Sequence, residues 1–151
     1  MVSTKTKEEI ELMSYAGKVA YDLLNDIEKE IKPGVTTGYL NDYADKFIRE
    51  RNCTPACLNY EGYPKSVCIS VNEEVVHGIP GTRKLKNGDI ISIDLVVNYK
   101  GYLADTARTY AVGEITKEVE NLLIHTKEAL YEGLSVIKEG IKLNEVCKKI
   151  E

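Results

Sequence analysis

Two aspartates have the types and spacing that most strongly suggest chemistry in this 151-residue chain. Asp94 lies within an apolar run from Asp89 to Val97, and Asp105 lies within a second run from Tyr102 to Val112. The turn residues between the runs, Asn98 to Gly101, predict an antiparallel hairpin with a four-residue loop. In that register Asp94 is opposite Asp105, with the two β-carbons about 4.5–5.5 Å apart.

Carboxylates at that distance repel each other, and the apolar neighbours of Asp94 make its charge costly. A shared proton, an arginine or a divalent metal ion could neutralise the pair. Arg108 is three positions from Asp105, so it points to the other face, and proton-sharing dyads lie in loops. The pattern therefore predicts a metal site with Asp94 and Asp105 as ligands, although two carboxylates are too few for a tight dinuclear centre. The alternative is an aspartate that ends a strand and meets solvent.

His77 is the second candidate for chemistry. We expect it at the end of a short strand, Glu74 to His77, followed by two glycines that let a backbone approach closely. An imidazole there could bind a metal ion or hydrogen-bond a reacting carbonyl. The other histidine, His125, is expected on a helix at a packed interface and without a catalytic role.

A segment rich in thiols and phenols precedes a predicted strand. Its sulfur and aromatic groups suit an apolar pocket for a thioether side chain, with ordinary loop packing as the alternative. The residues concerned are Cys57, Tyr60, Tyr63 and Cys68. A zinc site from Cys53, Cys57, Cys68 and His77 is a further alternative, but the spacing differs from that of paired zinc knuckles. Free thiols are expected rather than disulfides, because nothing marks the chain for secretion.

Helices and strands alternate around these residues in an α+β pattern. Thr6 and Glu9 form a capping box, and Thr36 or Thr37 and Thr116 precede further apolar periodicities of helical type. The expected elements are a helix from the capping box to about Ile31, a helix from Thr37 to about Asn52, a half-buried strand Ser66–Val71, the hairpin, a helix Thr116–Lys138 and a helical pattern from Leu143 onward.

The composition fits one globular domain over residues 1–151. Hydrophobic residues make up 43% and charged residues 29% of the chain, and no apolar run is long enough to span a membrane. A net charge of -4 argues against nucleic acid as a partner. We expect a cytoplasmic protein.

A short internal sequence repeat indicates how the chain is organised. Ile31–Val35 matches Ile137–Ile141, and in both places a long helix precedes the match and a helical pattern follows it. We interpret this as a weak duplication in which the first unit has helices and strands. The second unit has its helices only.

Three blocks of sequence closely resemble the amino-terminal half of type I methionine aminopeptidases of peptidase family M24: NYEGYPKSVCISVNEEVVHGIPG, NGDIISIDLVV and YLADTARTYAVG. The resemblance implies the α+β pita-bread (creatinase/aminopeptidase-like) fold, truncated after its first half and the first helices of the second. It also implies one partial catalytic domain over residues 1–151 that lacks the carboxy-terminal half.

The resemblance also implies roles for individual residues. Two divalent metal ions (cobalt, manganese, iron or zinc) are expected, with Asp94 as a ligand of one and Asp105 bridging both. His77 resembles the substrate-contacting histidine, and Cys57, Tyr60, Tyr63 and Cys68 fall where the family lines its methionine pocket. A monovalent cation is expected in the turn at Asn72 and Glu74.

The implied activity is removal of the amino-terminal methionine from peptides and nascent proteins when the second residue is small. The ribosome and a missing second half are candidate partners, and neither nucleic acid nor membrane is expected. The family's other metal ligands, a histidine and two glutamates, belong to that second half, so we expect the chain alone to be weak or inactive. The alternatives are a proline dipeptidase or aminopeptidase P, a non-catalytic relative that binds nascent chains or a partner, and one half of a split protein.

Overall fold

The computed structural model describes residues 4–151, which form two compact units that meet between Glu114 and Ile115. The helices are α1 (Lys7–Ile27), α2 (Thr37–Arg49), α3 (Lys117–Ser135) and α4 (Leu143–Ile150), with 3-10 turns η1 (Glu28–Glu30) and η2 (Tyr60–Gly62). The strands are β1 (Thr54–Pro55), β2 (Cys68–Val71), β3 (Ile90–Tyr99) and β4 (Tyr102–Ala111). No helix within the described range has the length and hydropathy needed to cross a membrane.

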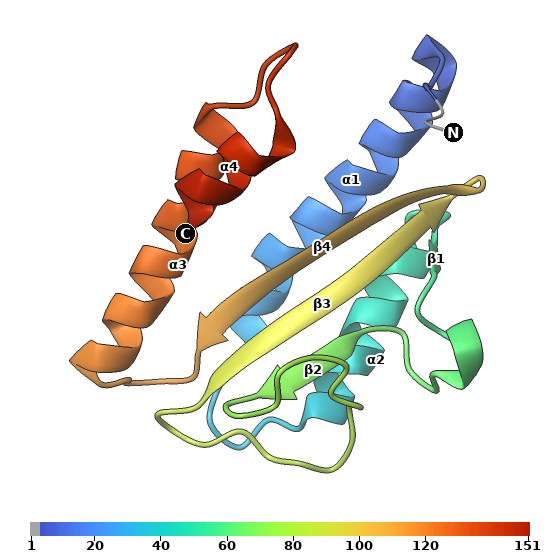
Figure 1. Ribbon diagram of the computed structural model, residues 1–151. Coiled ribbons are helices and arrows are strands. Elements are labelled where there is room, and N and C mark those ends of the chain that lie inside the picture. The colour runs from blue at the N-terminus through green and yellow to red at the C-terminus, as the bar shows by residue number, and fades with distance from the viewer. Residues whose placement is uncertain (1–3) are drawn as a thin grey trace. The chain divides into compact units, whose positions relative to one another are not determined.

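The first unit is a four-stranded antiparallel sheet with α1 and α2 on one face (Figure 1). β3 is its central strand: β4 pairs along one edge, and β1 and β2 pair with different parts of the other edge. The long β3–β4 hairpin therefore carries two short strands end to end. The loop between those short strands is the segment that the sequence marks as rich in thiols and phenols.

The helix starts follow from their capping residues. Thr6 accepts a hydrogen bond from the Glu9 N–H at 3.2 Å while the Glu9 carboxylate accepts from the Thr6 N–H at 2.7 Å, which confirms the predicted capping box. Thr36 caps α2 and Thr116 caps α3 through the same type of contact. The expected boundary near Ile31 is replaced by η1, which separates the end of α1 from Pro33.

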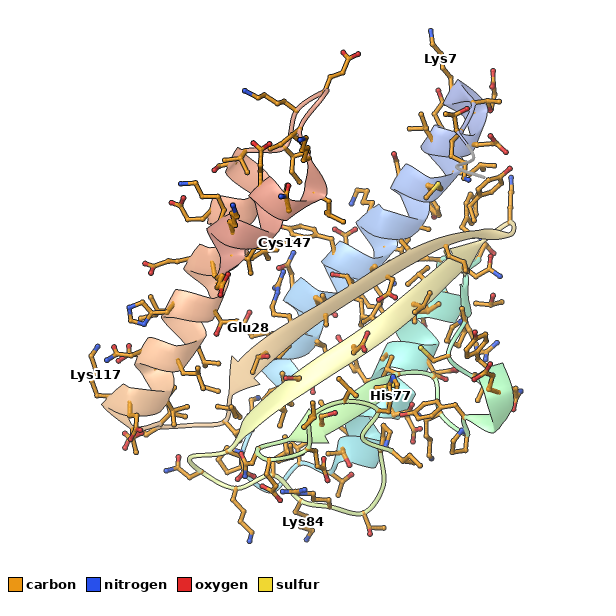
Figure 2. The ribbon with its side chains drawn as sticks, viewed as in Figure 1. Lys7, Glu28, His77, Lys84, Lys117 and Cys147 are labelled. Carbon is orange, nitrogen blue, oxygen red and sulfur yellow. The ribbon has the colours of Figure 1, made fainter. Side chains whose placement is uncertain are left out.

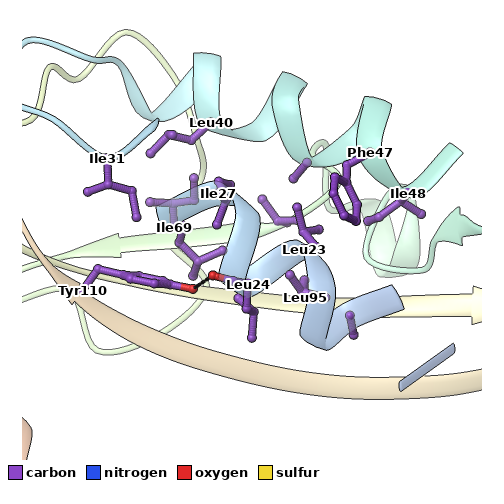
Figure 3. Close-up of a cluster of buried hydrophobic side chains, with 14 of the residues drawn as sticks. Leu23, Leu24, Ile27, Ile31, Leu40, Phe47, Ile48, Ile69, Leu95 and Tyr110 are labelled. Carbon is purple, nitrogen blue, oxygen red and sulfur yellow. Dashed lines mark hydrogen bonds between the residues drawn. The ribbon is translucent and has the colours of Figure 1, made fainter. Parts of the chain in front are cut away.

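The core lies between the sheet and the two helices (Figure 3). Alternate residues of β3 contribute fully buried side chains, and the Tyr110 hydroxyl donates a 2.6 Å hydrogen bond to the Leu24 carbonyl. The buried residues of β3 are Ile91, Ile93, Leu95 and Val97. Because neighbouring residues of a strand point to opposite faces, these four lie on the face away from Asp94. They flank Asp94 in the sequence but do not line its carboxylate, whose partial burial comes from other residues.

Two predicted strands differ in the structure. β2 is buried on both faces, because the segment after it returns and packs over Ser70: the Gly78 N–H donates to the Ser70 hydroxyl at 3.1 Å. The expected strand from Glu74 to His77 is absent, and these residues have no regular structure. A short apolar run does not by itself specify a strand. These residues form a loop because the backbone of Gly78, which follows them, bonds to β2.

The second unit is a pair of packed helices, α3 and α4. Gly133 is the contact point, since a β-carbon there would lie 2.6 Å from Ile150 Cγ1. Leu122 and Leu130 of α3, and Ile137 just beyond its end, belong to the apolar helical periodicity of the sequence, yet their side chains are exposed. His125 is also exposed and contacts the Asn121 carbonyl within its own helix at 2.7 Å, so the expected packed interface is not seen.

Helix α2 holds the entry to β2, and we expect this link to be sensitive to pH. Asp45 accepts hydrogen bonds from Ser66 at 2.6 Å and Arg49 at 2.7 Å. The Arg49 guanidinium and the Ser66 hydroxyl outweigh burial and hold the pKa of Asp45 below its usual value. A carboxyl with a lowered folded-state pKa stabilises the fold above its unfolded pKa and loses this effect as pH falls.

The free energy of unfolding of the Asp45→Asn variant should therefore be about 1–2 kcal/mol lower than that of the wild type at pH 7, allowing for the partial exposure of the pair. The difference from the wild type should shrink as the pH falls below about 4, the ordinary aspartate value. Urea unfolding at several pH values measures this. Asp22→Asn, in the exposed pair with Lys18, is the matched control and should change stability by less than about 0.5 kcal/mol. A pH-independent difference would contradict the prediction.

Candidate metal centre

The hairpin register differs from the predicted one by two residues. Asp94 pairs with Ala107 and Asp105 pairs with Val96, because the loop is the two-residue turn Lys100-Gly101. Both turn residues have positive φ, 51° and 88°, as tight hairpins require. A shift of two residues preserves the face on which each side chain lies, so the two carboxylates are diagonal neighbours on one face of the sheet.

That face is the one that α1 and α2 leave uncovered, and the two carboxylates differ in exposure. Asp94 is half-buried and Asp105 is exposed. Burial raises the pKa of the Asp94 carboxyl, and the negative charge of Asp105 raises it further, whereas His77 acts in the opposite direction. The two acids therefore interact as like charges, and a cation at this position would relieve their repulsion.

The carboxylates form part of the wall of a pocket of about 530 Å³. His77 lies on the same wall, and the thiols and phenols predicted to form a pocket are also there. The lining residues are Cys57, Tyr60, Glu61, Gly62, Tyr63, Pro64, Cys68, His77, Ile79, Asp94, Val96 and Asp105. The seven residues predicted from the sequence to bind the divalent metal ions or to contact the substrate therefore line one cavity, whereas Asn72 and Glu74 do not.

The strand arrangement explains why the two thiols share the pocket. Cys68 begins β2 and pairs with Asp94, while Ala56, which precedes Cys57, donates a 2.8 Å hydrogen bond to the Val96 carbonyl. Both cysteines thus lie beside the central part of β3, where β1 and β2 meet. Burial raises the pKa of each thiol and of the Tyr63 hydroxyl, so this part of the pocket is neutral and apolar.

His77 reaches the pocket from a loop and not from a strand end (Figure 2). Its backbone is in the left-handed region with φ of 58°, which costs a residue other than glycine about 1–2 kcal/mol. Its side chain is exposed at the rim and close enough to Asp94 to affect that carboxyl. The imidazole and the carboxylates therefore line the same cavity and interact electrostatically.

The donor set fits a hard or borderline divalent cation only in part. Asp94 and Asp105 supply carboxylate oxygens on one face, but no group of three or more metal-binding side chains occurs among residues 4–151. Cys53 lies in the hydrophobic core and its thiol donates to the Arg51 carbonyl at 3.5 Å, so it does not join Cys57, Cys68 and His77 in the alternative zinc site. The four cysteines are free.

Sequence reasoning missed some of the pocket. Val96 lies on the same face as Asp94, which the alternation of β3 could have indicated. Ile79, two residues after His77, is exposed and also lines the pocket, and nothing in the sequence distinguishes it from other exposed apolar residues. Ser70 is not in the pocket lining, and its contact with the Gly78 N–H has no sequence signal because it depends on how the loop returns.

Comparison with known proteins shows the family to which the chain belongs. The model of metallopeptidase family M24 matches residues 11–151. Methionine aminopeptidase 1 of Bacillus subtilis is 42% identical over the whole of this chain, which covers 61% of that protein. The Escherichia coli K12 methionine aminopeptidase is 46% identical, with 99% of this chain and 58% of that protein covered.

Solved structures give the same result for the fold. The crystal structure of methionine aminopeptidase from Rickettsia prowazekii has a TM-score of 0.96 and 41% identity, over 99% of this chain and 60% of that one. The Xaa-Pro dipeptidase from Bacillus anthracis, at 24% identity and a TM-score of 0.84, shares the fold. The expected α+β pita-bread architecture is confirmed over the part present, and the chain spans about 60% of the length of its relatives. The chain belongs to metallopeptidase family M24.

Proposed function

We propose that this chain is the part of a methionine aminopeptidase that recognises methionine and supplies the first two metal ligands. The enzyme would remove the amino-terminal methionine from peptides and nascent proteins when the second residue is small. One observation carries the proposal: a carboxylate pair, a histidine and a neutral lining of thiols and phenols share one cavity. The names of the relatives support it.

Asp94 and Asp105 would hold divalent metal ions. Bound there, such ions would polarise the peptide carbonyl and make water nucleophilic near neutral pH. The two aspartates line the same pocket as the thiols and phenols, so they would place the scissile bond beside the side-chain site. Oxygen ligands are compatible with manganese, iron, cobalt or zinc, so we propose two divalent ions without assigning the metal.

The rest of the pocket would select the substrate. Cys57 and Cys68 are neutral thiols beside Tyr63, with Tyr60 at the exposed rim, and sulfur and aromatic groups suit an unbranched thioether. His77 would contact the peptide between this side-chain site and the carboxylates. An imidazole can donate to or accept from a peptide group there, which would orient the bond to be cut.

The first experiment uses the 151-residue chain alone. Because it contains two carboxylate ligands, we expect weak manganese or cobalt binding by calorimetry and little or no release of methionine from Met-Ala-Ser. Robust turnover by the isolated chain would contradict our view that further ligands are required. The ligand assignment would be supported if Asp105→Asn lost metal binding while the remote variant Asp22→Asn kept it.

A chimera tests the activity directly. This chain would be joined to the remaining carboxy-terminal part of the Rickettsia prowazekii relative, to which it is 41% identical. We expect the chimera to cleave Met-Ala-Ser and not Ala-Pro, and to lose activity in its Asp105→Asn form. Cleavage of Ala-Pro instead would favour a proline dipeptidase or aminopeptidase P. No peptidase activity in a folded chimera that binds metal would favour a non-catalytic relative.

Further proposals concern cofactors, partners and location. A monovalent cation near Asn72 would depend mainly on backbone oxygens, since the Asn72 amide oxygen already accepts from the Ile90 N–H at 2.9 Å and Glu74 is paired with Arg83. We also propose nascent chains on the ribosome as substrates and a second half, on this chain or another, as the partner that completes the metal centre. Four free thiols support a reducing, cytoplasmic location.

A further inference from the structure

The backbone of Gly78 is held by contacts from two segments, β2 and the loop that contains Tyr63. Its carbonyl accepts hydrogen bonds from the Ile69 N–H and from the Tyr63 hydroxyl, each at 2.9 Å. Its N–H donates to the Ser70 hydroxyl at 3.1 Å. Ser70 and Ile69 belong to β2, the most fully buried strand of the sheet, so Gly78 is attached to a rigid part of the fold.

This attachment lies directly beside the strained residue His77. A left-handed backbone at a residue with a β-carbon persists only where surrounding contacts enforce it. His77 is exposed, and the hydrogen bonds nearest to it in the chain are those made by Gly78, with further contacts at Glu74 and Gly81 toward the ends of the loop. The contacts to Gly78 therefore supply the restraint that keeps His77 at the rim of the pocket.

Tyr63 connects this restraint to the pocket wall. Its ring lines the cavity beside Cys68, and its hydroxyl also lies 3.2 Å from the Val67 carbonyl. Tyr63 thus both lines the side-chain pocket and bonds to the carbonyl of Gly78, the residue after His77. A phenylalanine in its place would keep the wall and lose the contact.

We infer that Tyr63 is a positioning residue for His77, acting through the Gly78 carbonyl. The wall of the side-chain pocket and the histidine at its rim are then coupled. A substrate side chain that displaces the Tyr63 ring would also displace His77. The role of His77 toward a substrate rests on the proposed function. The positioning itself is a property of the free chain.

The test is nuclear magnetic resonance of the metal-free chain at constant pH, with and without Tyr63→Phe. The chain has two histidines, and His125 bonds within α3, so it serves as an internal reference. We expect the His77 ring signal to move in Tyr63→Phe. Amide exchange at Ile69 and Gly78 should become about fivefold faster, as loss of one typical hydrogen bond implies.

Tyr39→Phe is the matched control, because it removes a hydroxyl that bonds to Glu30 and not to Gly78 or β2. It should leave the His77 signal and the exchange at Ile69 unchanged. If Tyr63→Phe does not fold, Ser70→Ala is measured in the same way, since it removes the other side-chain contact to Gly78. An unmoved His77 signal, or faster exchange spread evenly over the core, would overturn the inference. Neither metal nor substrate is present, so failure of the proposed function would be seen separately, in the metal-binding and peptide assays.

Discussion

Asp94→Asn is expected to make the metal-free chain more stable and to weaken its binding of manganese. The substitution keeps the shape of the side chain and removes one of two like charges on adjacent strands. We expect the free energy of unfolding at pH 7 to rise by about 0.5 kcal/mol, within the range for cross-strand charge pairs. Manganese affinity should fall at least about 100-fold, because even groups behind the ligands cost 10–100-fold when removed.

Urea unfolding with and without manganese measures both effects in one experiment. Manganese should raise the unfolding midpoint of the wild type and leave that of Asp94→Asn unchanged. Asp89→Asn is the matched control of opposite sign, because Asp89 accepts from the Asn72 amide and the Lys86 N–H, at 2.9 and 2.8 Å, and should lose stability. If Asp94→Asn lowered the stability of the metal-free chain, Asp94 would be a structural residue, and the metal assignment would fail.

The relation between Asp94 and Asp105 shows which part of the site can be predicted from the sequence. Asp94 and Asp105 could be placed on one face because strand alternation has a period of two, and this conclusion holds although the predicted loop was two residues too long. The register itself could not be predicted, because Lys100 in a left-handed turn gives no clear signal in the sequence.

Helices were predicted better than their environment. The capping residues Thr6, Thr36 and Thr116 begin the helices where expected, since a cap is a local interaction. The burial of α3 was predicted wrongly because it depends on what packs against the helix. Leu122 and Leu130 show a helical apolar period in the sequence, yet their side chains are exposed in the structure.

The histidine loop, residues 74–78, was predicted least well. Its conformation depends on contacts with β2 and not on its own residue types. Val75 and Val76 have the composition of a strand, but the loop bonds to β2 through Gly78 instead of pairing along its own length. Cys57, Tyr63 and Cys68 were assigned to one pocket from the sequence. The second contact of Tyr63, to the backbone beside His77, depends on the fold.

Gly78→Ala should therefore damage both the fold and the site. A β-carbon at Gly78 would lie 2.2 Å from the Ile69 carbonyl oxygen and 2.9 Å from the Ser70 Cα, and these backbone atoms cannot move without displacing β2. We expect a loss of about 3 kcal/mol in the free energy of unfolding, the upper part of the usual range for an overpacked site. In the fraction that folds, the His77 ring signal should move, because the peptide after it can no longer take its place beside Ser70.

Gly81→Ala distinguishes this steric effect from a general intolerance of the loop. A β-carbon at Gly81 meets no atom within 4 Å, so its stability should stay within about 0.5 kcal/mol of the wild type. Urea unfolding of the two variants beside the wild type decides the matter. Equal losses would mean that the loop needs flexible glycines. A loss confined to Gly78→Ala would mean that His77 lies at the pocket because β2 leaves room for a hydrogen atom there and for nothing larger.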